Sequence, residues 1–394
     1  MTELCSDLAD QHVQLSKEAL NNHLNERTVC FLRELFFELF RYQKSLALPG
    51  IRLATTHSFR TLRILDATTI RLSKECQEEY PSSVGAGAKF QLEIDYLTGQ
   101  FHHLEIQPAK ANDCPSGQKR LANIRKDELF LQDLGYFQYD TFEQIDQAEA
   151  FYISRTRADA MFYTAHPTPR YHPDGTIVQK YAYERLFLEE KVKKLKPGEM
   201  RNYPRVYLGK HKKLPSRLIL YRMTEEEQRR QEYRIKRREQ TKQGVIKQKS
   251  LDLAGVSMLV TNLPAEIPAG EVVALYRYRW QIELLFRSWK SDLNLDQFRK
   301  MKQARWECHF YAELILLLLS TLITYQLRVR FYQEHNFILS EQIAVKEIAK
   351  KIGVHWRVRD GTDWLSTLQK IEKTLNAIGR KKEREPGPIS WLRA

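Results

Sequence analysis

The spacing of hydrophobic and polar positions changes several times along the chain and separates helical from β-rich parts. Apolar side chains recur at helical spacing over residues 16–47, with an interruption near Asn25, and predict two helices. From Leu62 onward, apolar and polar positions alternate in runs that are separated by turn residues. This alternation predicts three successive strands, mostly antiparallel, in LRILDATTIRLS, AKFQLEIDYLTG and QFHHLEIQPAK.

Helices and strands alternate in the next part of the chain. GQKRLANIR and TFEQIDQAEA have helical spacing, whereas ELFLQDLGYF and AFYISRT are short apolar runs typical of strands. Three strands followed by helix, strand, helix and strand form an α/β arrangement, in the element order of the ribonuclease H fold. We therefore expect a ribonuclease H-like mixed sheet with flanking helices.

A basic, β-rich insertion interrupts this order. Pro and Gly turns separate short strands such as RVYLGK and RLILYRM, and a highly charged helical tract follows them. The core resumes with the strand GVSMLVTNLP and a helix over 275–295. The predicted parts are a helical N-terminal region (1–58), the first core part (59–156), the insertion (157–252), the second core part (253–330) and a helical C-terminal tail (331–394).

The positive charge of the chain is concentrated in the insertion. The net charge is +14, and residues 191–250 hold 20 Lys and Arg against 6 Glu and no Asp, while the rest of the chain holds 43 residues of each sign. A basic segment of this kind is typical of a surface that binds nucleic acid. The alternative is a solvated charged helix, because Glu and Arg alternate in TEEEQRRQEYRIKRREQTKQ and partly cancel.

The remaining composition predicts a reduced, cytoplasmic protein that does not span a membrane. The five cysteines form no CxxC pair and have no histidine pair at ligand spacing, which argues against a zinc site or a disulfide framework. The first residues, MTELCSDLADQ, lack the apolar stretch of a signal peptide. The run YAELILLLLSTLITYQL contains Glu313 and is shorter than a membrane span, so we expect a buried or dimerising helix there.

Two aspartates stand where a sheet would present them. Asp66 lies between apolar neighbours in the first predicted strand, where an unpaired charge is costly unless a cation or metal meets it. Asp133 follows a strand just before a Gly turn, a position from which catalytic groups project. With Glu283 they would form a carboxylate cluster suited to a pair of Mg²⁺ or Mn²⁺ ions and to phosphoryl transfer. Three other aspartates lie in turns or loops and compete with Asp133: Asp95, Asp113 and Asp140. Spacing alone favours Asp133 only modestly over Asp113.

The helix over 275–295 carries its carboxylate among cations and aromatic residues. At about 100° per residue, one arc of about 60° holds a set of four: Tyr276, Arg279, Glu283 and Lys290. Arg287 and Trp280 border this stripe. The opposite side carries four residues that can pack on a core: Tyr278, Ile282, Leu285 and Trp289. Ordinary surface ion pairs explain such a stripe on most amphipathic helices, so the stripe alone is not specific.

Three motifs taken together resemble the insertion sequence 4 family of DDE transposases. The helix matches the family signature Y-x2-R-x3-E-x6-K without a gap. ILDATTIRL resembles the strand with the first Asp of the family, and LFLQDLGYF resembles the strand with the second Asp and its D-x-G-Y ending. The motifs occur in the order of the family over about residues 15–330, with the expected long insertion between the second Asp and the Glu.

The resemblance implies a role for each matched position. The catalytic, metal-binding triad would be Asp66, Asp133 and Glu283. The residues that hold phosphates of the transposon end would be Tyr276, Arg279 and Lys290, with Arg287 adjacent to them. Trp280 fits a packing role equally well.

The implied activity is that of a two-metal DNA transposase. It would cut insertion-sequence ends in double-stranded DNA and join the exposed 3′-hydroxyls to target DNA, as a homodimer in a synaptic complex, in the cytoplasm at the nucleoid. Two departures from the pattern of the family argue against full transposase activity. The family-like sequence begins almost at the first residue, so we expect a truncated end-recognition module. The insertion also lacks a Trp for base stacking, and Tyr207 or Tyr221 would have to replace it if a DNA hairpin forms.

Two other functions remain open at this point. The first is a non-catalytic DNA-binding remnant or inhibitor, which the short N-terminus favours and the intact carboxylates oppose. The second is a metal-dependent nuclease without strand transfer. The products formed from end DNA would separate all three functions.

Overall fold

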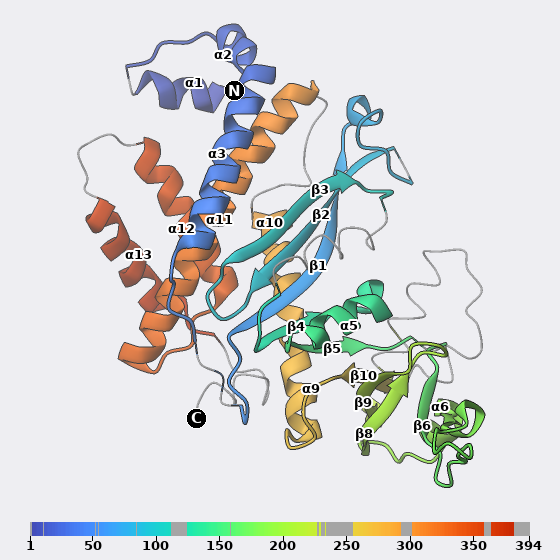
Figure 1. Cartoon of the computed structure of the whole chain (residues 1–394). Helices are drawn as coiled ribbons and strands as arrows, with labels where there is room; N and C mark the ends of the chain where they lie inside the picture. The colour runs from blue at the N-terminus through green and yellow to red at the C-terminus, as the bar shows by residue number, and fades with distance from the viewer. Residues whose placement is uncertain are drawn as a thin grey trace. The chain divides into compact units, whose positions relative to one another are not determined.

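The computed structural model describes the chain except for residues 1, 11, 52, 54, 84, 112–123, 158, 227, 230–232, 234–254, 293–301, 358–363 and 382–394. The chain forms two compact units (Figure 1). Unit 1 comprises Met1–Ala54, Thr61–Ser116 and Trp280–Ala394, and unit 2 comprises Thr55–Arg60 and Gly117–Arg279. Helices and strands occur in both units, so the fold class is mixed α/β, as the sequence predicts.

Unit 1 contains an antiparallel sheet of three consecutive strands: β1 (Thr61–Leu72), β2 (Ala86–Asp95) and β3 (Phe101–Pro108). The prediction of three antiparallel strands is therefore confirmed. β2 is buried at every position except Lys89, which is half-buried. The turn that leads to β3 is organised by Asp95, whose carboxylate accepts hydrogen bonds from the backbone of Leu62 and Leu97 and from Thr98 Oγ1.

The N-terminal helices of unit 1 are α1 (Thr2–Ala9), α2 (Lys17–His23) and α3 (Glu26–Ser45). The predicted interruption near Asn25 is confirmed, because the Asn25 side chain accepts hydrogen bonds from the first backbone N–H groups of α3 and caps it. The sequence did not predict α1. Gln43 fastens α3 to the sheet: its amide donates to Phe101 O at 2.6 Å and accepts from Phe101 N at 3.1 Å.

The strongly apolar run forms the middle of α11 (Gln303–His335). Among the described residues, α11 is the one helix long and apolar enough to cross a membrane, and half of its most apolar stretch is buried inside the protein. α11 packs against α3 and against α12 (Glu341–Arg357), and α12 also contacts α13 (Trp364–Ile378) (Figure 1). The contacts with two neighbouring helices account for the apolar composition of α11.

Unit 2 begins with the predicted strand, helix and strand. β4 (Glu128–Gln132) and β5 (Phe151–Arg155) pair in parallel, and α5 (Tyr139–Gln147) connects them. β10 (Val256–Thr261) pairs antiparallel with β5. The preceding helix predicted for GQKRLANIR falls almost entirely outside the described residues.

The strands of the predicted insertion extend the sheet of unit 2. In order from β10, the antiparallel neighbours are β9 (Leu214–Arg222), β8 (Met200–Leu208), β6 (Phe162–Ala165) and β7 (Tyr183–Leu186). Leu188 and Val192 of α6 (Leu188–Lys193) join the same hydrophobic core as Leu208 and Leu218. Most of the charged helical tract after β9 lies outside the described residues.

The helix predicted over 275–295 is divided, so its prediction as one continuous helix is wrong. α9 (Ala269–Arg277) ends in a turn at Tyr278 and Arg279, and α10 (Trp280–Asp292) follows. The backbone N–H groups of Tyr278 and Arg279 bond three residues back, to Leu275 O and Tyr276 O, each at 3.1 Å. Such tighter bonds end the regular α-helical ladder. The division places Tyr276 and Arg279 in unit 2 and Glu283 in unit 1.

Candidate active site

Unit 1 carries Asp66 and Glu283 on two elements that contact each other. Asp66 lies in the middle of β1, opposite Leu92 of β2, and is half-buried. Its Oδ1 accepts a hydrogen bond from the backbone N–H of Ala67 at 2.8 Å. α10, which carries Glu283, packs against β1 and α12. The strand of one predicted carboxylate therefore supports the helix of another.

The orientation of α10 follows from its buried side. The predicted core-facing side is confirmed, because its four residues are buried. They are 2%, 1%, 7% and 2% exposed, in the order Tyr278, Ile282, Leu285 and Trp289. Glu283 and Lys290 are half-buried and Arg287 is exposed, on the other side of the helix. Trp280 is 43% exposed, so it is not a core residue.

Unit 2 carries Asp133 directly after β4. It lies at the N-cap position of a 3₁₀ turn over Leu134–Tyr136, with φ −82° and ψ 169°, but its side chain makes no capping hydrogen bond. Among the described residues, its buried Oδ1 has no hydrogen-bond partner. Burying a carboxylate oxygen without a hydrogen-bond partner costs free energy. A cation or another ligand bound at Asp133 would offset this cost.

The aspartates that compete with Asp133 have other roles or lie outside the described residues. Asp95 is fully buried at the end of β2, and burial raises the pKa of its carboxyl despite the hydrogen bonds that it accepts. Asp140 pairs with Lys212 at 2.5 Å. Asp113 falls outside the described residues. Asp95 and Asp140 therefore already have partners within the protein, whereas the buried Oδ1 of Asp133 has none among the described residues.

Tyr276 and Arg279 lie close to Asp133 in unit 2. The Tyr276 hydroxyl donates a hydrogen bond to Gln132 O at 3.2 Å, so it contacts the residue directly before Asp133. Burial raises the pKa of Tyr276 above its usual value, and Arg279, which hydrogen-bonds with Tyr276, lowers it in part. Tyr276 is therefore a neutral hydrogen-bonding group at neutral pH.

The start of α9 is fixed by a buried glutamate that the sequence analysis did not single out. Glu271 is 4% exposed and accepts hydrogen bonds from Thr56 N at 2.9 Å and Thr56 Oγ1 at 2.7 Å. Arg217 of β9 donates to Pro264 O and Ile267 O, in the loop before α9. No local sequence signal marks these contacts, because Glu271 reads as an ordinary acidic residue in the first turn of a helix.

The three predicted metal ligands are divided between the units. Asp66 and Glu283 belong to unit 1, and Asp133 belongs to unit 2. The described part of the chain holds no ready-made group of three or more His, Cys, Asp or Glu side chains that could bind a metal ion. The ligand chemistry nevertheless fits, since carboxylate oxygens suit Mg²⁺ and Mn²⁺ and Asp133 has an oxygen to offer. The meeting of all three carboxylates stays a prediction.

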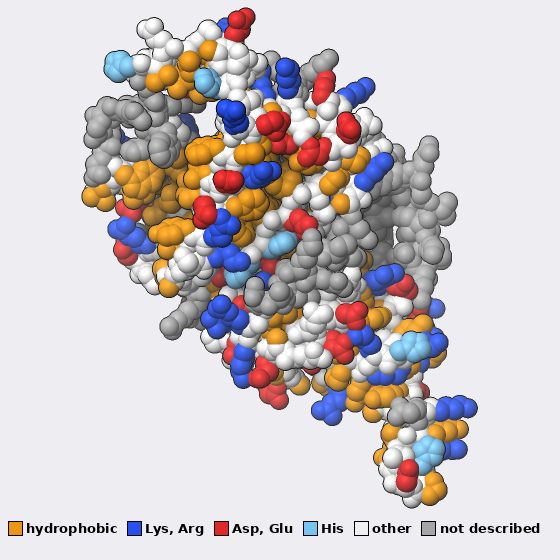
Figure 2. Space-filling view, turned by 45° about the horizontal axis from the view of Figure 1, so that its top comes forward, with side chains coloured by type: hydrophobic (Ala, Val, Ile, Leu, Met, Phe, Trp, Pro, Cys, Tyr) orange, Lys and Arg blue, Asp and Glu red, His pale blue; other side chains and the backbone are white. Residues whose placement is uncertain are grey.

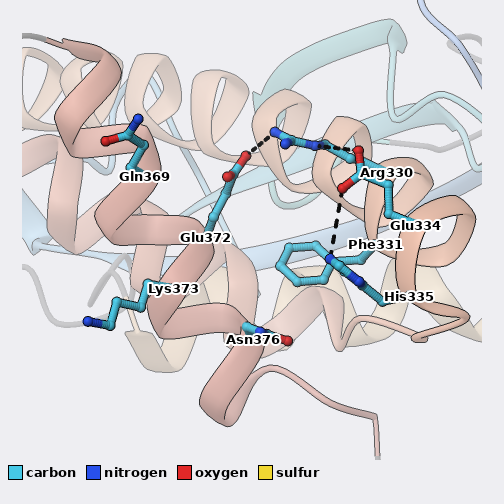
Figure 3. Close-up of a pocket in the computed structure, with 8 residues that line it drawn as sticks. All are labelled: Arg330, Phe331, Glu334, His335, Gln369, Glu372, Lys373 and Asn376. Carbon is cyan, nitrogen blue, oxygen red and sulfur yellow. Dashed lines mark hydrogen bonds and ion pairs between the residues drawn. The ribbon is translucent and has the colours of Figure 1, made fainter.

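Two cavities among the described residues are lined by other side chains. One of about 340 Å³ lies between α11 and α13, and Figure 3 shows that Arg330, which lines it, pairs with Glu334 and Glu372. The other, of about 650 Å³, lies in unit 2 beside α5 and the turn between β8 and β9. Its Lys212 and Arg157 are paired with neighbouring carboxylates. Neither cavity is lined by a predicted site residue.

Comparisons with known proteins agree with the motifs. The family described as "Transposase DDE domain" matches residues 57–319, a range that includes all seven predicted site residues. The transposase for insertion sequence element IS231E of Bacillus thuringiensis subsp. finitimus is 34% identical, over 98% of this chain and 82% of that protein. The transposase for insertion sequence element IS1151 of Clostridium perfringens is 30% identical, over 79% of this chain and 67% of that protein.

A solved structure of a piggyBac transposase synaptic complex with hairpin DNA aligns with a TM-score of 0.41 and 10% identity, over 84% of this chain and 59% of that chain. This similarity is too distant to inform the site. The family match and the similarity to the insertion-sequence transposases do not depend on it. From these matches, the chain belongs to the DDE transposases of insertion sequences, in the group related to insertion sequence 4.

Proposed function

We propose that this protein cuts the ends of an insertion sequence and joins their 3′-hydroxyls to target DNA by two-metal phosphoryl transfer. The observation that carries the proposal is the unpartnered, buried Oδ1 of Asp133, in the stretch LFLQDLGYF that resembles the second-Asp strand of the family. A structural aspartate would have a partner, as Asp95 and Asp140 do. Asp133 instead has an oxygen available for a cation.

In this proposal, the catalytic residues are Asp66, Asp133 and Glu283. Their carboxylates would hold two Mg²⁺ or Mn²⁺ ions, which when bound activate an attacking oxygen and stabilise a leaving oxygen. Arg279, Arg287 and Lys290 would bind phosphates of the DNA end and hold the scissile bond in register. Transfer to target DNA then needs no covalent intermediate with the protein, since the 3′-hydroxyl of the end is the nucleophile.

The experiment that tests this function uses purified full-length protein, Mg²⁺ and duplex DNA from the borders of the element that encodes it. We expect cleavage at the element end and, with plasmid target, covalent joining of the 3′ end. Removal of the metal with EDTA should stop both reactions, and Asp133→Asn should do the same. End binding without any cleavage would indicate the non-catalytic alternative, and cleavage without joining would indicate a nuclease.

Basic residues of the insertion are expected to supply much of the affinity for DNA. Deleting residues 191–250 would remove β8 and β9 from the sheet of unit 2, so substitutions are the cleaner test. We choose four exposed lysines for replacement by glutamine: Lys193, Lys194, Lys196 and Lys210. Each phosphate contact that is lost should reduce the slope of log K against log salt by about 0.9, so the total reduction should lie between about 1 and 4.

The salt dependence is measured by fluorescence anisotropy with duplex DNA at several salt concentrations. The matched control replaces four lysines on α12 and α13 that are also exposed: Lys346, Lys350, Lys370 and Lys373. We expect this control to keep the slope of the wild type. An unchanged slope in the insertion variant would mean that its charge is a solvated surface.

We further propose a homodimer as the synaptic form, because two DNA ends must be held together. Figure 2 shows hydrophobic side chains exposed on one face of the molecule. The helices of unit 1 contribute such residues, and on α3 they are Phe31, Leu35, Phe37 and Tyr42, between 37% and 64% exposed. Exposed apolar side chains of this size favour association between proteins. Acting on chromosomal DNA, the protein would be found in the cytoplasm at the nucleoid.

A further inference from the structure

We propose that Arg155 is a further DNA-binding residue of the active site, which contacts the scissile phosphate or a phosphate directly next to it. The inference rests on the proposed function, since it adds one residue to the set that holds the DNA end. Arg155 is the last residue of β5 and is exposed. It lies on a strand, outside the signature Y-x2-R-x3-E-x6-K that the stretch from α9 to α10 carries.

The pairing of β4 with β5 places Arg155 beside Asp133. The two strands are parallel, and Gln132 is aligned with Ser154. The next residues are Asp133 and Arg155, and Asp133 keeps an extended backbone with φ −82° and ψ 169°. Neighbouring strands lie about 4.8 Å apart, and successive side chains alternate between the two faces of a sheet. Asp133 and Arg155 are therefore neighbours at the same edge and on the same side of the sheet.

The Tyr276 hydroxyl gives independent evidence that these two groups are close together. It donates a hydrogen bond to Gln132 O at 3.2 Å, at the end of β4. Burial is the largest cause of the raised pKa of this hydroxyl. Among the charged groups, Asp133 raises the pKa further, whereas Arg279 and Arg155 lower it. Because a charge shifts a pKa only from nearby, Asp133 and Arg155 both lie close to this hydroxyl.

An arginine beside an aspartate is commonly its ion-pair partner, but Arg155 does not have this role. Asp133 Oδ1 has no hydrogen-bond partner among the described residues, and no carboxylate in this part of the chain pairs with Arg155. Arg157, two residues further on, differs: its guanidinium binds both carboxylate oxygens of Asp159, each at 3.0 Å. The charge of Arg155 is therefore available to an anion from outside the protein.

The chemistry of a guanidinium group matches a DNA phosphate at this edge of the sheet. Ligands of α/β sheets bind outside the carboxyl ends of the strands. A phosphate that reacts at Asp133 must lie at the end of β4, and Arg155 ends the neighbouring strand. Arginine presents a planar fork of N–H donors that can bind two oxygens of one phosphate. Arg155 would thus hold the cut strand directly beside Asp133.

The test measures coupling between Arg155 and individual phosphates of the DNA. End-DNA affinity of the full-length wild type and of Arg155→Gln is measured by gel shift, with Ca²⁺ in place of Mg²⁺. The DNA is unmodified or carries one neutral methylphosphonate, at the scissile position or at either adjacent position. We expect Arg155→Gln to bind unmodified DNA about tenfold or more weakly. At one of these positions, the methylphosphonate should weaken binding by the wild type by a similar factor and binding by Arg155→Gln by no more than about twofold.

Arg157→Gln is the matched control, because it removes an exposed arginine of the same segment. Its guanidinium is already held by Asp159, so we expect DNA affinity within about twofold of the wild type and no coupling to these phosphates. Arg155→Lys keeps the charge but loses the fork of donors, and should recover only part of the affinity. Since both arginines are exposed, the melting temperatures of the variants should stay close to that of the wild type.

Two results would overturn the inference. Additive losses at every modified phosphate would show that Arg155 contributes only a general positive charge. The other is weaker Mn²⁺ binding by Arg155→Gln, measured by electron paramagnetic resonance without DNA, which would show that Arg155 supports Asp133. Removing a nearby cation should otherwise leave the Mn²⁺ affinity unchanged or raise it.

Mg²⁺-dependent cleavage of unmodified end DNA by the wild type tests the proposed function separately. Cleavage without coupling between Arg155 and a phosphate refutes the inference alone. Coupling without cleavage refutes the proposed function alone.

Discussion

Replacing Glu283 with glutamine is expected to abolish metal-dependent cleavage of end DNA while end binding stays close to that of the wild type. Glutamine keeps the shape of the side chain and removes its charge, so a metal ligand is lost but the half-buried surface of α10 is retained. A bound metal supplies several kcal/mol of transition-state stabilisation, which corresponds to a loss of about 10³-fold or more in the cleavage rate. Single-turnover cleavage with Mg²⁺ and gel-shift binding with Ca²⁺ measure the two properties separately.

Lys290→Ala is the companion variant on the same helix and should show the opposite pattern. Removing one charged hydrogen bond to phosphate should weaken end binding by about tenfold or more, whereas cleavage at saturating protein should largely persist. Glu266→Gln removes an exposed carboxylate just before α9 and should change neither property. Near-normal cleavage by Glu283→Gln would show that α10 carries ordinary surface charges and no catalytic group.

Local periodicity predicted the elements that hold the candidate site. Alternation identified β1 with Asp66, and a short apolar run identified β4 with Asp133 after it. Helical spacing separated the buried side of α10 from the side of Glu283 correctly. These predictions succeed because strand and helix periods are set by neighbours in sequence and by which side is buried.

The contacts that fix the site could not be predicted in the same way. The turn at Tyr278 and Arg279 divides an apolar pattern that continues on both sides of it, so the spacing alone indicates one helix. The bond from Tyr276 to Gln132 O uses a backbone carbonyl, which every residue possesses. Glu271 meets Thr56 from 215 positions away. Pairings at such distances follow from the tertiary fold and leave no local pattern.

An ion-pair network supports α12, which contacts α10, the helix that carries Glu283. Glu341, at the start of α12, pairs with Arg328 of α11 at 3.2 Å and with Lys381 at 3.1 Å. Arg328 also donates to Tyr96 O and Leu97 O, in the turn between β2 and β3. One carboxylate thus connects two helices and the sheet of unit 1, and α12 contacts α10.

Glu341→Gln is expected to destabilise unit 1 by about 3–5 kcal/mol at pH 7, because the buried Arg328 guanidinium loses its charged partner. Burial by itself would raise the pKa of Glu341, but Lys381 and Arg328 outweigh it and lower this pKa to about 2. A carboxyl with a lowered pKa in the folded state stabilises the protein above its ordinary pKa near 4.5, and this stabilisation is lost as the pH falls toward 2. The difference between wild type and variant should therefore shrink between about pH 5 and pH 2.

Urea denaturation at several pH values measures this difference, with Glu334→Gln as the control. Glu334 pairs with Arg330 of the same helix at 3.0 Å, but that pair is about half exposed, so its loss should change stability little. Replacing Arg328 with methionine together with Glu341→Gln should recover part of the loss, because the uncompensated buried charge is then removed as well. A pH-independent difference, or a loss no larger than that of Glu334→Gln, would show that the Glu341 network contributes little to the support of α10.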